Sequence, residues 1–326
     1  MSNDNTSTDS NSLDPLDPLE LDTIVFSGGG SKGYCYIGVI KHLDEVGILP
    51  NLKTYMGTSI GSLFATLLCI GYTYKELYDV FIHFDYSDFH RINIMNFLCN
   101  YGLDDFSGME GLIIKLFTVK SVSVICTFAD LYKQTGKRLC INAISLNSKK
   151  VVYFNHETSP DMKVIIALKS SMAIPYIFVP VKYNDDMYID GGLLENFMIN
   201  HEWLGGQLGG QLSPITPSPE EVTKENKEHS TSNIKSKGVL GINLFSCSNT
   251  SEHENAPIDI YQFSQAVISC IFDDMHRREQ SNSNKKQKII TINCDNNSLD
   301  FDLDMENKQS LFKLGYETML NSFKVS

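Results

Sequence analysis

A serine between glycines is the first candidate for chemistry in this chain. Ser59 is the centre of the motif Gly57-Thr58-Ser59-Ile60-Gly61, which follows a strand-like segment at 53–56 and precedes an apolar run at 63–70. At such a strand-to-helix turn a serine occupies a sharp elbow, and the helix directs its N-terminus at the hydroxyl. Ser59 is therefore predicted to be a nucleophile. The alternative is that its side chain only caps the helix.

A glycine-rich loop precedes this elbow. The motif Gly28-Gly29-Gly30-Ser31-Lys32-Gly33 lies between a β-branched run at 23–26 and an apolar-periodic segment that ends near Glu45. Glycines leave no side chain between the backbone N–H groups and a ligand. Beside a helix N-terminus these donors favour negative charge, so the loop predicts an anion site, either permanent or formed only during a reaction.

The same loop satisfies the Gly-x-Gly-x-x-Gly pattern, so a nucleotide-binding Rossmann module is an alternative. That fold places an acidic residue at the end of the second strand, about twenty residues further on. Here Asp44 and Glu45 fall within the first predicted helix, and the second strand leads to the serine motif instead. The pattern therefore favours acyl transfer, in which the Ser59 hydroxyl attacks a carbonyl carbon and the glycine loop binds the oxyanion that forms, over nucleotide binding.

A third motif adds a candidate acid to the serine and the glycine loop. Asp190-Gly191-Gly192 follows a short strand-like segment at 187–189, which places the carboxylate at a strand end, where α/β sites are assembled. His156, His201 and His276 belong to no recognisable motif, so the sequence favours a Ser–Asp pair in which Asp190 accepts the serine proton directly. A free aspartate has a pKa of about 3.9 and is a weak base. Burial must raise that pKa, or the pair must act by orientation in a dry site.

Strand-like and helical segments alternate through the chain, which predicts an α/β fold with a mostly parallel sheet covered by helices on both faces. We expect one domain at 21–326, preceded by a disordered polar tail at 1–20 and interrupted by a flexible insertion at about 205–237. Strands are expected at 23–26, 53–56, 136–145, 150–154, 177–183, 187–189, 238–245 and 288–294, and residues 85–105 are expected to be irregular. All three motifs follow predicted strands, so we expect them to meet at one edge of the sheet.

Composition excludes several classes of protein. A net charge of −12 argues against a nucleic-acid partner and against general attraction to anionic membranes. Eight scattered cysteines without a Cys-x-x-Cys pair indicate free thiols in a reducing compartment. The acidic stretch from Asp295 to Glu306 has Asp300 where a calcium loop requires glycine, so no metal site is expected.

No apolar run reaches the length of a membrane span, and the polar, acidic N-terminus is not a secretory signal. We therefore expect an intracellular, soluble protein that is not secreted.

The three motifs, in this order, resemble the patatin-like phospholipase family over roughly residues 21–200, and the run Ser-Met-Ala-Ile-Pro-Tyr-Ile-Phe before Asp190 is also similar. The resemblance implies a single patatin-like domain and a serine-dependent lipid acyl hydrolase of the phospholipase A type, without cofactor or metal. Its substrate would be a lipid at a membrane or micelle surface, to which the protein would bind peripherally. A non-catalytic lipid-binding protein of the same fold is the remaining alternative.

By position, the resemblance makes Ser59 the nucleophile and Asp190 the proton acceptor. The backbone of Gly28, Gly29 and Gly30 would form the oxyanion hole, and Lys32 would hold either a phosphate or the loop itself. The aromatic stretch at 84–101 is expected to form part of a lipid-facing lid. The supporting motif residues are Ser31, Lys32, Gly33, Gly57, Thr58, Ile60, Gly61, Gly191 and Gly192.

Overall fold

The computed structural model describes residues 20–84, 92–204, 238–246, 259–279, 287–295 and 298–324. The predicted insertion at 205–237 lies outside these ranges, as does the predicted tail except for its last residue, Glu20.

A mostly parallel sheet forms the centre of the molecule, in the order β10-β9-β1-β2-β4-β8-β7, with β5 paired to β4. The parallel strands are β1 (Thr23–Phe26), β2 (Thr54–Gly57), β4 (Arg138–Ser145), β9 (Val239–Ser246) and β10 (Gln287–Cys294). The antiparallel strands are β5 (Lys150–Phe154), β7 (Val181–Tyr183) and β8 (Asp186–Asp190). Every residue of β1 and β2 is buried, as expected for central parallel strands covered on both faces.

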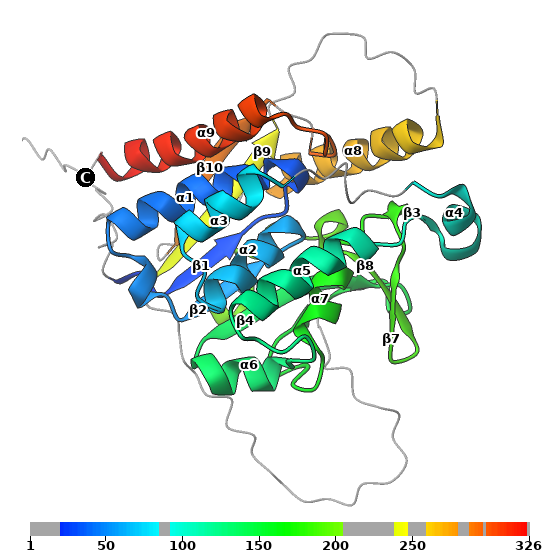
Figure 1. Ribbon diagram of the computed structural model, residues 1–326, viewed down its shortest axis with the longest axis horizontal. Coiled ribbons are helices and arrows are strands. Elements are labelled where there is room, and N and C mark those ends of the chain that lie inside the picture. Colours follow the sequence, from blue (N-terminus) through cyan, green and yellow to red (C-terminus); the bar gives the residue numbers. More distant parts are fainter. Residues whose placement is uncertain are drawn as a thin grey trace, which may run out of the picture.

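Helices flank this sheet (Figure 1). They are α1 (Tyr34–Glu45), α2 (Ile60–Cys69), α3 (Tyr74–Ile82), α4 (Ile94–Asn100), α5 (Ser107–Val119), α6 (Phe128–Thr135), α7 (Val164–Ser171), α8 (Ile260–Glu279) and α9 (Met305–Lys324). The fold class predicted from the sequence, α/β with a mostly parallel sheet flanked by helices, is confirmed.

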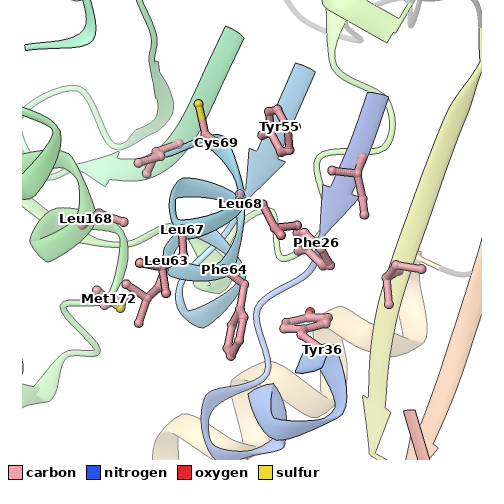
Figure 2. Close-up of a cluster of buried hydrophobic side chains, with 14 of the residues drawn as sticks. Phe26, Tyr36, Tyr55, Leu63, Phe64, Leu67, Leu68, Cys69, Leu168 and Met172 are labelled. Carbon is pink, nitrogen blue, oxygen red and sulfur yellow. The ribbon is translucent and has the colours of Figure 1, made fainter. Parts of the chain in front are cut away.

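Helix α2 is the centre of the main core. All its residues except Ile60 are buried, because it lies between the sheet and the neighbouring helices. Figure 2 shows Phe64 and Leu68 of α2 among Phe26 of β1, Tyr36 of α1 and Met172 at the end of α7. This packing holds the N-terminus of α2, and therefore Ser59, in a fixed position relative to the sheet.

The opposite side of the central strands has its own smaller core. Val25, Met56 and Cys140 alternate with the residues of the main core along β1, β2 and β4, so they point to the other face. The segment at 197–204 covers them, with Phe197 and Met198 buried against the strands.

The structure differs from the sequence prediction around residues 92–104, which were expected to be irregular. They form α4 and the short strand β3 (Gly102–Asp104), which pairs in parallel with β6 (Tyr176–Phe178). The side chain of Asn93 accepts a hydrogen bond from the Met95 N–H at 2.9 Å and caps α4. A seven-residue helix and a three-residue strand are too short to give a clear periodic pattern.

The single strand predicted at 177–183 is in fact two strands in different sheets, because β6 ends at Phe178 and β7 begins at Val181. Pro180 lies between them, and a proline has no N–H with which to continue a ladder.

Candidate active site

The three motifs meet at one edge of the sheet, but only two of them follow parallel strands, and the third follows an antiparallel strand. The strands β1 and β2 are parallel neighbours, and their carboxyl ends lead to the glycine loop and to Ser59. Strand β8 runs antiparallel to β4, and Asp190 pairs with Ala143. Since Gly57 pairs with Ile141, Asp190 lies just beyond the end of β2. The acid thus reaches the site from the outer side, on a strand that runs against its neighbours.

Ser59 occupies a strained elbow, with φ 51° and ψ −127°. The turn needs the glycines on either side, because a Cβ at Gly57 would lie 2.2 Å from the Gly61 carbonyl oxygen, and one at Gly61 would lie 2.3 Å from that of Ser27. The Ser59 N–H donates to Ser171 Oγ at 2.9 Å, which fixes the elbow against α7. No side chain caps α2. Ser59 holds the N-cap position of α2, but its hydroxyl accepts no hydrogen bond from the N–H groups of the helix, so the helix-cap alternative is wrong.

The partner of that hydroxyl is Asp190. Ser59 Oγ donates to Asp190 Oδ2 at 2.6 Å, and the other carboxylate oxygen accepts from the Gly192 N–H at 2.7 Å. The Asp190 side chain is fully buried, and this burial raises its pKa to about 7, although the hydrogen bonds from Ser59 and Gly192 act in the opposite direction. The carboxyl group is thereby converted from a weak base into one that can accept a proton near neutral pH.

The glycine loop presents fewer open donors than the sequence suggested. The Gly28 N–H donates to the Asn196 carbonyl oxygen at 3.0 Å, so this donor is already used, whereas it was expected to contribute to an oxyanion hole. Within the described ranges, the Gly29 and Gly30 N–H groups have no hydrogen-bond partner. Gly30 has φ +55°, and a Cβ there would lie 1.9 Å from the Ser298 carbonyl oxygen, so only glycine fits.

Lys32 lies inside the protein. Its side chain is fully buried, and its positive charge acts on the buried thiols of Cys35 and Cys294, whose sulfur atoms are 3.7 Å apart. The Lys32 N–H donates to the Gly29 carbonyl oxygen at 3.1 Å. Lys32 lines neither of the two cavities that touch Ser59, so of the two roles predicted for it, holding a phosphate or holding the loop, its position favours the loop.

The other motif residues shape the site through packing. Gly33 lies against α2, where a Cβ would be 2.6 Å from Ile60 Cγ1, and Gly191 lies against Asn142, whose Oδ1 would be 2.6 Å from a Cβ. The Ser31 N–H donates to the Ser298 carbonyl oxygen at 2.9 Å and ties the glycine loop to the chain after β10. Thr58 is buried, and its hydroxyl has no hydrogen-bond partner in the described part of the chain.

An apolar pocket opens beside Ser59. Phe64 of α2, Phe81 of α3 and Met109 of α5 line it, together with Phe178 of β6. A second, smaller cavity touches Ser59 between Gly29, Gly30, Asn196 and Ser298. The serine thus lies between an apolar space and the open backbone donors of the glycine loop.

The histidines considered in the sequence belong to other surroundings. His156 stacks on Tyr132 with ring centroids 4.0 Å apart, and His201 lies 4.5 Å from the ring of Tyr153. Burial lowers the pKa of both, that of His201 to about 4. The side chain of His276 lies outside the described residues.

The described part of the chain contains no group of three or more His, Cys, Asp or Glu side chains arranged to hold a metal ion. No helix within the same ranges has the length and apolar character needed to cross a bilayer.

Sequence reasoning missed two positioning residues, Ser171 and Asn196. Ser171 is the first residue of the Ser-Met-Ala-Ile-Pro run, but the pattern of that run assigns the serine no role. Asn196 accepts from the Gly28 N–H through its carbonyl and donates from its side chain to the Gly28 carbonyl at 3.3 Å. The contact between Asn196 and Gly28 joins residues 168 positions apart, so only the folded chain shows it.

The chain is similar to several known proteins. The chain is 35% identical over 191 residues to "Probable lipid hydrolase 463L" of Invertebrate iridescent virus 6, an alignment that covers 57% of this chain and 64% of that protein. It is 26% identical over 313 residues to "Uncharacterized protein R571" of Acanthamoeba polyphaga mimivirus, covering 92% and 93% of the two chains.

Among solved structures, VipD from Legionella pneumophila superposes with a TM-score of 0.55 and 15% identity over 94% of this chain and 67% of that one, which shows a shared fold. The family model described as patatin-like phospholipase matches residues 24–202, which include all three motifs. Since this match spans more than half of the chain, the protein belongs to the patatin-like phospholipase family.

Proposed function

We propose that this protein is a lipid acyl hydrolase of the phospholipase A type that cleaves fatty-acyl esters with Ser59 and Asp190, at a membrane or micelle surface. The observation that carries the proposal is the 2.6 Å hydrogen bond from Ser59 Oγ to a buried Asp190 whose pKa is raised to about 7. A hydroxyl becomes a nucleophile when a base within hydrogen-bond reach takes its proton. This pair supplies both groups without a histidine.

In the first half of the reaction, Ser59 Oγ attacks the ester carbonyl carbon while its proton passes to Asp190 Oδ2. The negative charge that develops on the carbonyl oxygen needs fixed donors, and in the glycine loop the Gly29 and Gly30 N–H groups are open for this role. The tetrahedral intermediate then collapses, the C–O bond to the alcohol breaks, and the alcohol leaves with the proton from Asp190. The product is an acyl ester on Ser59.

In the second half, Asp190 takes a proton from a water molecule that attacks the acyl carbonyl carbon. The free fatty acid is released, and Ser59 regains its proton from Asp190. The pocket lined by Phe64, Phe81, Met109 and Phe178 supports an apolar acyl group, since such a lining recognises hydrocarbon and repels charge. Ile60 and Met172 extend the same lining next to the nucleophile.

The two alternatives have less support. A Rossmann module would need an acid at the end of β2, where the chain instead forms the Ser59 elbow. Lipid binding without catalysis does not require a serine in a strained conformation that is hydrogen-bonded to a carboxylate whose pKa is near 7.

The chain offers a matched control for the test. Ser145 Oγ donates to Asp186 Oδ2 at 2.6 Å, the same distance as in the Ser59–Asp190 pair, but Ser145 lies in β4 and has no elbow. Hydrolysis of a soluble short-chain ester and of phosphatidylcholine would be measured for Ser59→Ala, Asp190→Asn and Ser145→Ala.

We expect kcat/KM to fall by roughly 10⁴-fold or more in the first two variants and to stay near the unmodified level in the third. A fluorophosphonate should label Ser59 in the unmodified protein and leave Ser59→Ala unlabelled. Full esterase activity in purified Ser59→Ala would contradict the proposal.

A further inference from the structure

Helix α4 exposes a continuous set of large apolar side chains. Ile94, Met95 and Leu98 are 51%, 59% and 66% exposed, with Ile92 before the helix and Tyr101 after it also exposed. No charged residue occurs from Ile92 to Leu103. Single exposed apolar residues are ordinary, but a contiguous uncharged group marks a surface that meets another apolar phase. We call these five residues, together with Tyr176, the α4 surface.

The α4 surface is continuous with the wall of the pocket beside Ser59. Strand β3 follows α4 and pairs with β6, where Gly102 is opposite Tyr176, and the Phe97 ring lies 6.3 Å from that of Tyr176. Tyr176 is 48% exposed, whereas Phe178, two residues further along β6, is buried and lines the pocket. Figure 1 shows α4 and β3 at the end of the molecule, projecting beyond the body of the sheet.

The unit formed by α4, β3 and β6 therefore has an outer apolar face, the α4 surface, and an inner apolar face toward the pocket. On the inner side, Phe106 and Phe178 pack with ring centroids 5.0 Å apart and both border the pocket. Strands β3 and β6 connect the α4 surface to the pocket lining, and the one charged residue of these two strands, Asp104, is buried. This continuity points to lipid as the occupant of the surface.

From this geometry we infer that the α4 surface docks on a bilayer of zwitterionic phospholipid, an inference that rests on the proposed function. The uncharged side chains from Ile92 to Leu103 provide no cation for an anionic headgroup, and the net charge of −12 opposes approach to an anionic bilayer. Isoleucine, methionine and leucine enter the acyl boundary, and tyrosine suits the headgroup level. Such docking depends on buried apolar area and responds weakly to salt.

The test uses the full chain carrying Ser59→Ala, so that binding is measured without turnover. Flotation with phosphatidylcholine vesicles would compare this protein with the same protein carrying Met95→Ser and Leu98→Ser. The matched control carries Val119→Ser and Ile125→Ser, two residues that are 69% and 61% exposed at the far end of α5 and in the loop beyond it. Far-ultraviolet circular dichroism would verify that all three proteins are folded.

We expect the α4 variant to bind about tenfold more weakly, with the control unchanged and binding little affected by salt. Equal binding by the α4 variant would overturn the inference. Binding that requires anionic lipid and disappears in salt would also overturn it. The inference would also be overturned if the protein were a dimer and the Met95→Ser and Leu98→Ser substitutions converted it to a monomer. The α4 surface would then be occupied by a second copy of the chain.

A separate assay distinguishes failure of this inference from failure of the proposed function. With Ser59 intact, the α4 variant should hydrolyse a soluble short-chain ester at the unmodified rate and lose activity only on vesicles. If the unmodified protein hydrolyses no ester but binds vesicles through α4, the proposed function fails and the docking surface stands. If the soluble ester is cleaved and the α4 variant still binds and cleaves vesicles normally, the surface fails and the function stands.

Discussion

Ser59 Oγ lies 2.6 Å from Asp190 Oδ2, although the two residues are 131 positions apart in the chain. One comes from the elbow after β2 and the other from the end of the antiparallel strand β8. Because Asp190 is fully buried, its pKa is raised to about 7 and its charge state changes within the physiological range. Both the activity and the stability of the protein should therefore depend on pH through this residue.

The activity should rise with pH through about 7. Only the deprotonated form of Asp190 accepts the Ser59 proton, so kcat/KM on a soluble ester should increase on the acid side and level off above the pKa of about 7. The measurement is a pH–rate profile between about pH 5 and about pH 9, with Ser145→Ala as the matched control. A flat profile across this range would contradict a role for Asp190 as the base.

The stability should respond in the opposite direction. The folded-state pKa of Asp190 is raised above the unfolded value of 3.8, so the unfolded chain loses this proton first as pH rises from about 4 to about 7. The unmodified protein thus loses stability across this window, and Asp190→Asn does not. We expect the variant to gain up to about 4 kcal/mol relative to the unmodified protein above pH 7, and little at pH 4. Urea unfolding at the two pH values measures this, and an equal difference at both would contradict it.

Ser171 should act as a positioning residue. Its hydroxyl accepts the Ser59 N–H at 2.9 Å, and Ser171→Ala would leave that buried N–H without a partner at a cost of about 1–3 kcal/mol. We expect kcat to fall by roughly 10-fold to 100-fold with little change in KM, because the elbow that aims Ser59 is loosened. The neighbouring Ser170 donates to Ile166 within α7, so Ser170→Ala is the matched control and should retain kcat. Equal losses in the two variants would assign Ser171 a general structural role.

Substitution of glycine by alanine should have opposite effects in the glycine loop and in a regular helix. Gly30→Ala places a methyl group 1.9 Å from the Ser298 carbonyl at φ +55°, so we expect lost activity and a lower Tm. Gly111→Ala in α5 meets no atom within 4 Å and should retain activity and stabilise the protein by up to about 1 kcal/mol. Ester hydrolysis and thermal unfolding measure both effects. Full activity in Gly30→Ala would contradict the assignment of this loop as the oxyanion site.

The apolar pocket should set the acyl length. Met109 lines it from α5, and Met109→Trp would fill part of the space that a long acyl chain needs. We expect KM for a long-chain ester to rise by about tenfold or more while a short-chain ester is cleaved normally. A series of p-nitrophenyl esters of increasing chain length measures the change. An equal effect on all lengths would indicate that the acyl chain lies elsewhere.

Much of the framework could be predicted because it depends on local pattern. The β-branched run before Gly28 gives β1, the apolar run after Ser59 gives α2, and the glycines at 57 and 61 mark the elbow between strand and helix. Alternation of strands and helices was enough to predict the α/β class. Each of these features lies within a few residues of the motif that it positions, so the sequence alone specifies it.

Features that depend on distant neighbours were decided by the tertiary structure. Strand β8 has the same local pattern in either direction, and only its pairing with β4 brings Asp190 to Ser59 from the outer side. The raised pKa of Asp190 and the interior position of Lys32 follow from burial, which no short stretch of sequence encodes. The engagement of the Gly28 N–H by Asn196 joins residues 168 apart, and it reduces the open donors to Gly29 and Gly30. The sequence thus determined which groups are present, and the packing of the folded chain decided which of them remain free to react, because burial and hydrogen-bond partners are properties of three-dimensional neighbours.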